Sequence, residues 1–560
     1  MVIVGFVAVA LLLAGISLYV LTQPGPVSAN IPPTVNDVTV TPAAGDNTTS
    51  FTFVADVSDD RDPPSSIQVR WDWENDSAWD TPWSTGKAAD HLFAQPGDYT
   101  VRVEAIDTGN LTATVARQVR VSHAPLRVGT ILSLTGPLQG FGVSQQNAVD
   151  MAVEEINAAG GVFGQPIQVF HMDDHTSPID AQNAAMTLVG SDKVVAIIGA
   201  TGSFMCASVL QVAKATAVFE VAPSCTSPIF SDLAYTGGWF ARTVPSDALQ
   251  AAVAASYAHE NRTFAMAGVI ALNNDYGVGT AAAFVSNFTR FGGVITGSLV
   301  LIDPLASDYT SDLHLVLDAN PPPEVVYAIV YPPSGVVLMR NWWEGLGANP
   351  GWANVSWMFS DAVYDQSNFI DPLVSAGVDV SAFEGTSPAV YAQIEPPEFA
   401  AWSARYQAIY GTPPALFAAN SYDAAYLVAL AAEAVGFAGG AGIRAKIQSV
   451  ADPAGTVVRP NEWNIALQEL AAGRDIDYEG ASGPANLNGF GDVAAPYIVW
   501  ALDASSLLYT KEFFNESLVV SLLPAGSFPL EAPLGPAQTA ASPARGSREE
   551  PASKEPRTFL

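Results

Sequence analysis

The chain has 560 residues, which is too long for one hydrophobic core, so three or four structural units are expected. Its 55 acidic and 23 basic residues give a formal net charge of −32, and a field of that sign repels phosphate backbones and anionic lipid. Nucleic-acid binding is therefore disfavoured. Such a surface suits a protein kept soluble in a salty exterior, although a solvated acidic face without special meaning is equally compatible with the charge.

The first predicted element is an uncharged apolar segment, residues 2–21, which is long enough to cross the hydrocarbon core of a membrane. It is either a retained anchor (residues 1–23) or a signal peptide cleaved near Val27-Ser28-Ala29. We favour the anchor because the segment is long for a signal-peptide core. With either, the rest of the chain lies outside the cytoplasm. The Pro-rich residues 24–33 then form a linker.

Residues 34–122 predict an antiparallel β-sandwich, because short alternating strands are broken by Asp, Gly and Pro. The alternation is clearest in Phe51–Val54, Val69–Trp73 and Tyr99–Ala105. Two of its stretches, Trp71-Asp72-Trp73 and His91-Leu92-Phe93 with the following Pro96–Val101, resemble the Ig-like PKD module of cell-surface proteins. That resemblance implies a spacer or an adhesive unit.

The main body, residues 125 to about 522, repeats an apolar strand, a turn of small residues and an amphipathic helix, which predicts an α/β fold with parallel sheets. The first series of strands comprises Val128–Leu132, Ile167–Phe170, Val194–Ile198 and Val218–Val221. A second series comprises Phe264–Leu272, Val294–Ile302, Val325–Tyr331 and Val355–Phe359. Two series in tandem indicate two lobes with a cleft between them. The Pro-, Ala- and Ser-rich residues 523–560 predict a disordered tail.

Two turns of the first series carry small hydroxyl residues. Gly199–Ser203 precedes a helix that runs to about Ala215, and we interpret Ser203 as its N-cap. The N-terminus of that helix offers free N–H groups to a carboxylate. The next strand ends in Ala222–Pro228, which contains Ser224 and Thr226. Because adjacent parallel strands end at one sheet edge, the two turns predict a small-ligand site rather than a reaction centre.

Six separated motifs of the main body stand in an order and spacing that resemble a known family. They are Leu134–Pro137 with Phe141-Gly142, Glu154–Gly161, Asp173-Asp174, Arg242–Asp247, Asn274–Gly277 and Tyr478–Gly483. Over about residues 125–505 the chain is similar to the type I periplasmic binding proteins of the branched-chain amino acid (Leu/Ile/Val) class.

The resemblance implies two lobes that are joined by three crossings and close around a ligand like a hinged trap. Lobe one would contain residues 125–245 and 388–490, and lobe two residues 246–387 and 491–522. The implied crossings are Arg242–Asp247, Gly385–Pro388 and the stretch after Gly483.

Carried over residue by residue, the resemblance also implies the ligand contacts. Ser203, Ser224 and Thr226 would hold the α-carboxylate and α-ammonium groups of an amino acid. Aromatic contacts would come from Phe141 in lobe one and from Tyr276 and Tyr331 in lobe two. Asp361 would take the ammonium group, although it is one methylene shorter than the Glu of well-known leucine binders.

The two cysteines, Cys206 and Cys225, are candidates for one disulfide in an exported protein. Their placement differs from that of the cysteine pair in well-known members of the family. Cys206 falls in the first turn of the predicted helix and Cys225 inside the ligand turn, so a bridge would brace the site. Two buried thiols are the alternative.

Two acidic clusters are possible metal sites, and for both we favour a structural role. The cluster Asp56, Asp59, Asp60 and Asp62 offers oxygen ligands for calcium, or forms a solvated turn. The cluster His171, Asp173, Asp174 and His175 coincides with a βα loop of the family. The sequence has no zinc-ligand spacing, phosphate loop or Gly-x-Ser-x-Gly elbow, so no metal, cofactor or catalytic residue is predicted.

The expected function is that of an exported, cell-surface substrate-binding protein that captures a branched-chain or related small amino acid or amide. Its partner would be the permease of an ABC-type transporter in the same membrane, with the β-sandwich as a stalk. The main alternative is a receptor ectodomain that reports the ligand. A cleft hydrolase is disfavoured because the predicted site offers hydroxyls without a paired base.

Overall fold

The computed structural model describes residues 29–389, 397–525 and 527, and the chain divides into two compact units, Met1–Ala124 and Pro125–Leu560. The predicted anchor or signal peptide, the first part of the linker and nearly all of the predicted tail lie outside the described residues. Within the described residues no single helix has both the length and the apolar composition to cross a membrane. The bent helix pair Ala418–Val435 and Gly440–Lys446 meets both criteria when taken together.

The first unit contains two sheets that share one core. The strand orders are β1 (Thr34–Thr41), β3 (Ser50–Ser58), β5 (Ala88–Leu92), and β2 (Gly45–Asp46), β7 (Thr112–Ser122), β6 (Gly97–Ile106), β4 (Gln68–Asp72). In β3 every second residue is buried, and the ring of Phe53 contacts Trp71 and Trp73 at centroid distances of 5.8 and 5.1 Å. A β-rich N-terminal module is therefore confirmed.

The aspartates of this module that we considered for calcium include two that organise turns. Asp59 Oδ1 accepts the backbone N–H groups of Arg61 and Asp62, both at 2.8 Å. The carboxylate of Asp62 accepts from the N–H and the hydroxyl of Thr108. In the part of the chain that the structure describes, no three His, Cys, Asp or Glu side chains are grouped so as to hold a metal ion.

Lobe one is built on a sheet of parallel strands. Their order is β12 (Phe240–Arg242), β11 (Phe219–Ala222), β10 (Ala196–Gly199), β8 (Arg127–Leu132), β9 (Gln168–Asp173). Its helices are α2 (Gln139–Ala158), α3 (Pro178–Gly190), α4 (Ser203–Thr216), α5 (Leu233–Thr236), α11 (Pro397–Tyr410), α12 (Ala418–Val435), α13 (Gly440–Lys446) and α14 (Trp463–Ala471), with the strand pair β19 (Thr456–Val458) and β20 (Ile476–Tyr478).

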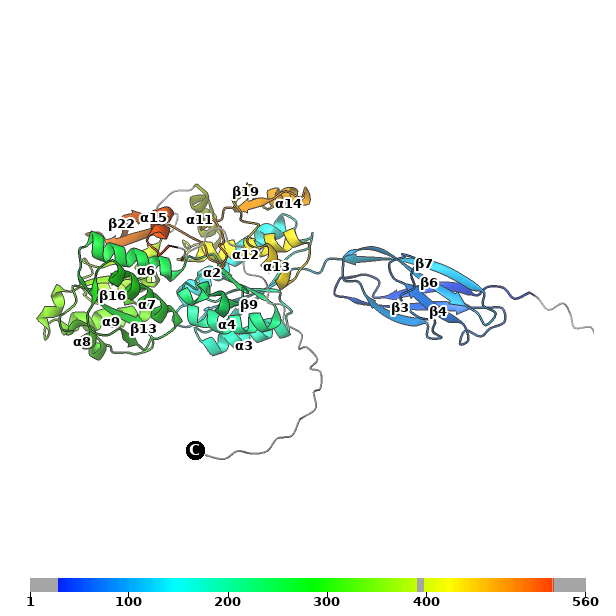
Figure 1. Ribbon diagram of the computed structural model, residues 1–560, viewed down its shortest axis with the longest axis horizontal. Coiled ribbons are helices and arrows are strands. Elements are labelled where there is room, and N and C mark those ends of the chain that lie inside the picture. Colours follow the sequence, from blue (N-terminus) through cyan, green and yellow to red (C-terminus); the bar gives the residue numbers. More distant parts are fainter. Residues whose placement is uncertain (1–28, 390–396, 526, 528–560) are drawn as a thin grey trace, which may run out of the picture. The chain divides into compact units, whose positions relative to one another are not determined.

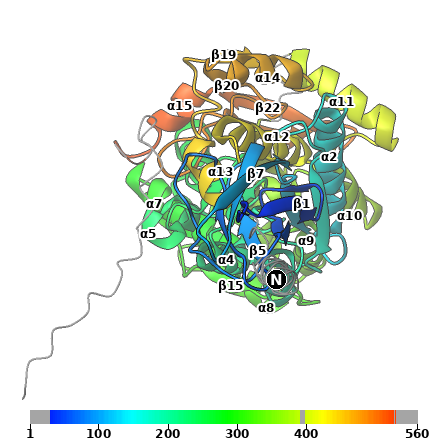
Figure 2. The ribbon, with the colours of Figure 1, turned by 90° about the vertical axis from the view of Figure 1, so that its right-hand side faces the viewer.

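The chain returns to lobe one after building lobe two. The Ala-rich helix α12 is buried along most of its length and shares a core with α2 and with β8, β10 and β11. Helix α11 lies alongside α2, where the hydroxyls of Tyr406 and Ser144 are 2.8 Å apart (Figure 2). Segments far apart in sequence therefore hold the start of α2 in place.

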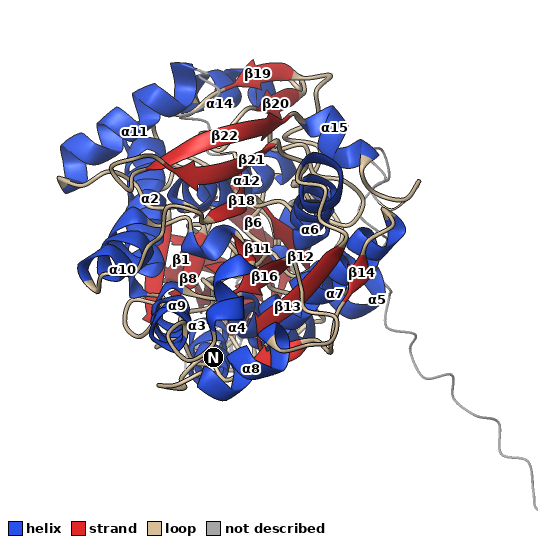
Figure 3. Ribbon diagram, turned by 90° about the vertical axis from the view of Figure 1, so that its left-hand side faces the viewer, coloured by secondary structure: helices blue, strands red, loops and turns tan. Residues whose placement is uncertain are grey.

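Lobe two has a longer, mixed sheet. Its order is β14 (Val294–Ile295), β13 (Met266–Leu272), β16 (Val325–Ile329), β17 (Ser356–Phe359), β18 (Glu384–Pro388), β21 (Tyr497–Leu502), β22 (Leu508–Phe514), with β15 (Val300–Ile302) also paired to β13. Strands β18, β21 and β22 form the antiparallel end of the sheet (Figure 3). The helices of this lobe are α6 (Asp247–Ser256), α7 (Asp275–Arg290), α8 (Thr310–Leu317), α9 (Pro332–Gly345), α10 (Asp371–Ser375) and α15 (Glu516–Ser521).

The predicted α/β architecture with two lobes is confirmed, and Figure 1 shows α7, α9, β13 and β16 of lobe two to the left of α3, α4 and β9 of lobe one. Two local details differ from the sequence interpretation. The single strand predicted for Val294–Ile302 is two short strands, since Gly297 between them has φ +69°. Residues Gly385–Pro388 lie within β18, inside the lobe-two sheet.

Glu220 of β11 is a carboxyl group buried in the core of lobe one. It has no exposed surface, and neither side-chain oxygen has a hydrogen-bond partner among the described residues. Burial raises the pKa of Glu220 well above its ordinary value of 4.5. The folded chain therefore holds this proton more tightly than the unfolded chain. As the pH rises from below 4.5 toward the raised pKa, the unfolded chain loses the proton first, so the free energy of unfolding falls.

We expect Glu220→Met to raise the free energy of unfolding at pH 7.5 by about 1–3 kcal/mol, because it removes unpaired buried oxygens and the cost of their ionisation. The gain should be smaller at pH 4, where Glu220 is protonated in both states. Urea unfolding of both proteins at the two pH values measures it. An equal gain at both would contradict a raised pKa.

Candidate functional site

A small inner pocket, part of it open to solvent, lies between the lobes at the carboxyl ends of β10 and β11. It brings together all seven residues that the sequence analysis singled out as ligand contacts. Its lining comprises Leu138, Phe141, Thr201, Gly202, Ser203, Ser224, Thr226, Tyr276, Tyr331, Asp361, Ala362 and Phe417. This lining includes no lysine, arginine or histidine.

The lobe-one wall consists of the two predicted hydroxyl turns, tied together by a residue that sequence analysis missed. Gln145 of α2 is buried; its Nε2 donates to Ser224 Oγ at 2.7 Å, and its Oε1 accepts from Thr201 Oγ1 at 2.8 Å. The sequence did contain one indication of this role, because Gln145 is a polar side chain on the apolar face of α2. Gln145 fixes the spacing of the two turns.

The interpretation of Ser203 as a helix cap is wrong. Gly202 occupies the N-cap position of α4, and Ser203 is the first residue of the helix. The Oγ atom of Ser203 accepts the backbone N–H of Ser227 at 3.2 Å, so the hydroxyl joins one turn to the other. The early N–H groups of α4 are therefore left without a side-chain cap beside the pocket.

The lobe-two wall is aromatic and acidic. Tyr276 lies in the first turn of α7, whose N-cap Asn274 accepts the N–H of Gly277 at 3.0 Å. The hydroxyl of Tyr276 donates to Ser360 Oγ at 2.8 Å and to Asp361 Oδ1 at 2.9 Å. The ring of Tyr276 stacks on Tyr331 at a centroid distance of 5.3 Å.

Asp361 is the carboxyl group that lines the inner pocket, and only 1% of its surface is exposed. Burial raises its pKa to about 6, against the opposing effect of hydrogen bonds from Tyr276 and Gln250. A buried carboxylate without a basic neighbour in the pocket lining is suited to accept a cationic group of a ligand.

Arg242 positions the ligand turn and was also missed as a site residue. It is fully buried, and its Nε donates to Asp492 Oδ1 at 2.6 Å. One terminal nitrogen donates to the carbonyls of Cys225 and Ser227, both at 3.0 Å. Because these carbonyls flank Thr226, the guanidinium group holds that residue at the pocket, and its charge is balanced by Asp492.

Residues 125–473 match the family model described as periplasmic binding protein. The chain belongs to this family. Its members bind solutes and are not enzymes, so the main body is a solute-binding protein. Residues 37–120 match the PKD domain, which identifies the N-terminal β-rich module of this binding protein.

Individual relatives agree with this placement. The binding protein is 26% identical over 400 residues to the chemotactic signal transduction system substrate-binding protein BasB of Halobacterium salinarum, covering 68% of this chain and 87% of that one. It is 30% identical over 233 residues to the Leu/Ile/Val-binding protein BraC3 of Rhizobium johnstonii, covering 41% of this chain and 62% of that one. The second match thus spans less than two thirds of that relative.

Solved structures show the same fold. The leucine-binding protein LivK of Thermotoga maritima superposes with a TM-score of 0.58 at 22% identity, covering 70% of this chain and 99% of that one. A solute-binding protein of an ABC transporter from Rhodopseudomonas palustris, in complex with 3,4-dihydroxybenzoic acid, superposes with a TM-score of 0.56 at 19% identity, covering 70% and 98%.

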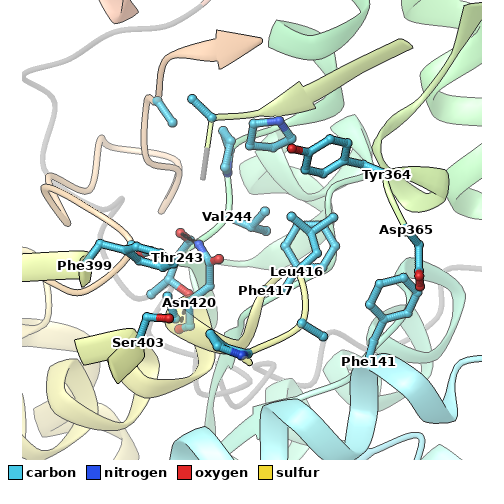
Figure 4. A pocket seen from close by; sticks show the side chains of 18 of the residues that line it. Phe141, Thr243, Val244, Tyr364, Asp365, Phe399, Ser403, Leu416, Phe417 and Asn420 are labelled. Atoms are coloured by element: carbon cyan, nitrogen blue, oxygen red, sulfur yellow. Dashed lines mark hydrogen bonds between the residues drawn. The ribbon is translucent and has the colours of Figure 1, made fainter. Parts of the chain in front are cut away.

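A larger outer pocket of about 1690 Å3, part of it open to solvent, lies beside the inner one. The rings of Phe141 and Phe417, with centroids 6.3 Å apart, line both pockets and separate them. Figure 4 shows the outer pocket, with Phe141 and Asp365 on the side opposite Phe399 and Ser403. Phe417 was not predicted, because its position depends on the fold of the returning chain.

In the cluster His171, Asp173, Asp174 and His175, the two aspartates form hydrogen bonds to the loop after β8. Asp173 accepts the N–H groups of Leu134 and Thr135, and Asp174 Oδ1 accepts from the hydroxyl of Ser133 at 2.6 Å. These bonds hold the segment that leads into α2.

Cys206 and Cys225 are joined in a disulfide that links the first turn of α4 to the ligand turn, with a Cα–Cα distance of 6.5 Å. We expect the Cys206→Ala/Cys225→Ala double variant to lose about 3 kcal/mol of unfolding free energy, because the bridge closes a loop with a sequence separation of 19. Thermal unfolding of both proteins measures this loss. Thiol titration of the denatured, unreduced protein provides the check, since two reactive thiols would show that the bridge does not form.

Proposed function

We propose that this binding protein captures a branched-chain or related small α-amino acid in the inner pocket and delivers it to the permease of an ABC-type importer. One observation carries the proposal: the pocket places neutral hydroxyl and N–H groups on its lobe-one wall and a buried, unbalanced carboxylate on its lobe-two wall. This arrangement is complementary to a zwitterion.

On the lobe-one side, Ser203, Ser224 and Thr226 would hold the ligand carboxylate together with free N–H groups at the start of α4. Neutral donors bind a carboxylate without placing a second isolated charge in the interior. The partial positive charge at a helix N-terminus adds to the attraction.

On the lobe-two side, Asp361 would accept the ligand ammonium, with Tyr276, Tyr331 and Phe141 around the side chain. A charge-assisted hydrogen bond contributes about 1.5–3 kcal/mol. Because the two ends of the ligand are held by different lobes, binding favours the closed arrangement.

Amino acids are favoured over aromatic acids, which a related fold binds, because of Asp361. An aromatic acid carries no amino group and would leave this carboxylate buried without a countercharge, which is costly.

A thermal-shift screen of the amino acids, short amides, benzoate and 3,4-dihydroxybenzoate tests the proposal. We expect a small apolar amino acid to stabilise the protein, by about 2.7 kcal/mol at 100 times its Kd. The aromatic acids should have no effect. Stabilisation by the aromatic acids alone would overturn the assignment of the ligand class.

The same proposal places the protein outside the cytoplasm, held at the membrane by residues 1–23 with the PKD module as a spacer. The family membership and the disulfide support an exported protein. Cell fractionation with and without residues 1–28 tests the anchor. We expect the full chain in the membrane fraction and the shortened chain, exported on a cleavable signal peptide, in the soluble fraction.

A second candidate function is sensing, in which the loaded protein docks on a membrane-bound signal transducer. The name of the Halobacterium salinarum relative, which belongs to a chemotactic signal transduction system, favours it. Deletion of the gene separates the two functions: loss of labelled ligand uptake supports delivery, whereas loss of the tactic response with normal uptake supports sensing.

A further inference from the structure

Asp247, the first residue of α6, lies behind the inner pocket and has 1% of its surface exposed. Its N–H donates to the carbonyl of Thr226 at 2.8 Å, and its Oδ2 accepts from Thr280 Oγ1 at 2.7 Å. Its Oδ1 is buried and accepts no well-formed hydrogen bond among the described residues. Asp247 thus contacts the ligand turn of lobe one and helix α7 of lobe two, and its Oδ1 atom has no well-formed hydrogen bond within the described part of the chain.

The carboxyl group of Asp361 is its electrostatic neighbour. The two groups accept hydrogen bonds from Thr280 and Tyr276, which are four residues apart and therefore on one face of α7. Each carboxylate disfavours the ionisation of the other. Two fully buried acids facing the same helix cannot both be charged without cost.

The surroundings supply little positive charge. Arg242 is the basic residue that acts on Asp247, and it is already paired with Asp492. The other titratable groups that interact with Asp247 are four tyrosines, which come from α7, β16, the N-cap of α9 and β21: Tyr276, Tyr327, Tyr331 and Tyr497. No unpaired positive charge among these groups therefore balances the Asp247–Asp361 pair when both carboxyl groups are ionised.

Burial, followed by the repulsion from Asp361, raises the pKa of Asp247 to about 8, against the effect of the hydrogen bond from Thr280 and of the nearby Thr226 hydroxyl. The pKa of Asp361 is raised less, to about 6. Burial and mutual repulsion therefore favour a proton on this pair, and Asp247, whose pKa is raised further, is the carboxyl group that more readily holds it.

We propose that Asp247 is a second acidic residue of the ligand site, which carries a proton in the empty cleft and releases it to the solvent when a ligand amino group binds beside Asp361. The inference rests on the proposed function. Proton release would couple ligand capture to pH. It would also favour ligands with an amino group, because a ligand without a cationic group does not stabilise the ionised form of Asp247.

The size of the effect follows from the charges. A cation within about 4–6 Å lowers the pKa of a carboxyl group by about 1–3. Starting from about 8, this brings Asp247 to or below neutral. The proton passes from Asp247 to the buffer, and the charge of a second carboxylate, behind the pocket wall, then adds to the attraction that Asp361 exerts on the ligand ammonium.

The ligand-free state is tested by potentiometric titration of the wild type and of Asp247→Asn. Other buried carboxyl groups titrate near neutrality as well, among them Asp361, Asp174 and Asp423, whose pKa values are raised to about 6, but they are present in both proteins, so the difference between the two curves reports Asp247. We expect the wild type to release about one proton more than the variant between pH 6.5 and 9.5. Superimposable curves would overturn the proposal.

The coupling is tested by calorimetric titration at pH 7.5 with the amino acid that stabilises the protein most, in phosphate and in Tris. These buffers differ in ionisation enthalpy, so the difference in heat reports the number of protons released. We expect between about half a proton and one proton per ligand for the wild type, and none for Asp247→Asn. As a matched control, Asp371→Asn removes an exposed lobe-two carboxylate and should release as many protons as the wild type.

The outcomes separate the two claims. If an amino acid binds with the same heat in both buffers, proton coupling is wrong while the proposed function stands. If no amino acid binds, the proposed function fails and the coupling fails with it, whatever the ligand-free titration shows for Asp247.

Discussion

Replacing Asp361 with asparagine should weaken the binding of an α-amino acid by about tenfold to about 150-fold. The carboxylate is buried in the inner pocket, and the loss of a charge-assisted hydrogen bond of about 1.5–3 kcal/mol corresponds to this range. Calorimetric titration of both proteins with the same amino acid measures the change.

The fold should tolerate this substitution. Asparagine retains an oxygen that can accept from Tyr276, and it removes the repulsion between Asp361 and Asp247. We therefore expect a melting temperature no lower than that of the wild type. Asp365→Asn is the matched control: it removes a carboxylate four residues away that lines the outer pocket, and affinity should stay within twofold. Equal affinity of Asp361→Asn and the wild type would remove the ammonium role.

Replacing Gly279 with leucine should prevent closure and reduce affinity at least tenfold. Gly279 lies in α7 of lobe two, and a Cβ atom built there would be 2.8 Å from Ser227 Oγ and 2.9 Å from Pro228 Cδ of lobe one. Nearby, Ser227 Oγ donates to the carbonyl of Asp275 at 2.9 Å. A leucine side chain would separate these surfaces and keep Asp361 away from a ligand held by lobe one.

The same substitution should leave the lobes intact, since leucine has a higher helix propensity than glycine by about 0.8 kcal/mol. Small-angle scattering with saturating ligand should give a larger radius of gyration for the variant than for the wild type. Gly190→Leu, at an exposed glycine with open space around it, controls for the added side chain and should bind normally. A Gly279→Leu protein that binds like the wild type would show that this contact is not part of closure.

The sequence was informative where the evidence is local. Alternation in Phe51–Val54 and the apolar runs at β8, β10 and β11 determine which elements form, since burial of a strand face needs only nearby residues. The two hydroxyl turns could be brought together by a topological rule, because parallel neighbours end at the same edge.

Contacts made by distant segments could not be predicted in this way. Gln145 bridges Ser224 and Thr201, and its role depends on how α2 packs over two turns that follow it by more than 50 residues. Phe417 reaches the pocket from the returning chain. Periodicity identifies the face on which a residue lies but not the partner that the face meets.

Asp247 illustrates a different limit. The motif that contains it was recognised as a crossing between lobes, and an acidic residue at the start of a helix is ordinary. Only the structure brings it beside Asp361 and leaves one of its oxygens unpaired. The charge balance of a buried site depends on groups from several elements at once.

The central claim is that the pocket between the lobes recognises an amino group through Asp361. Calorimetric titration with one α-amino acid and with its 2-hydroxy analogue, in which a hydroxyl group replaces that amino group, tests the claim most directly. We predict saturable binding of the amino acid at one site per chain and at least tenfold weaker binding of the hydroxy acid. Equal affinity for the two compounds would contradict the account.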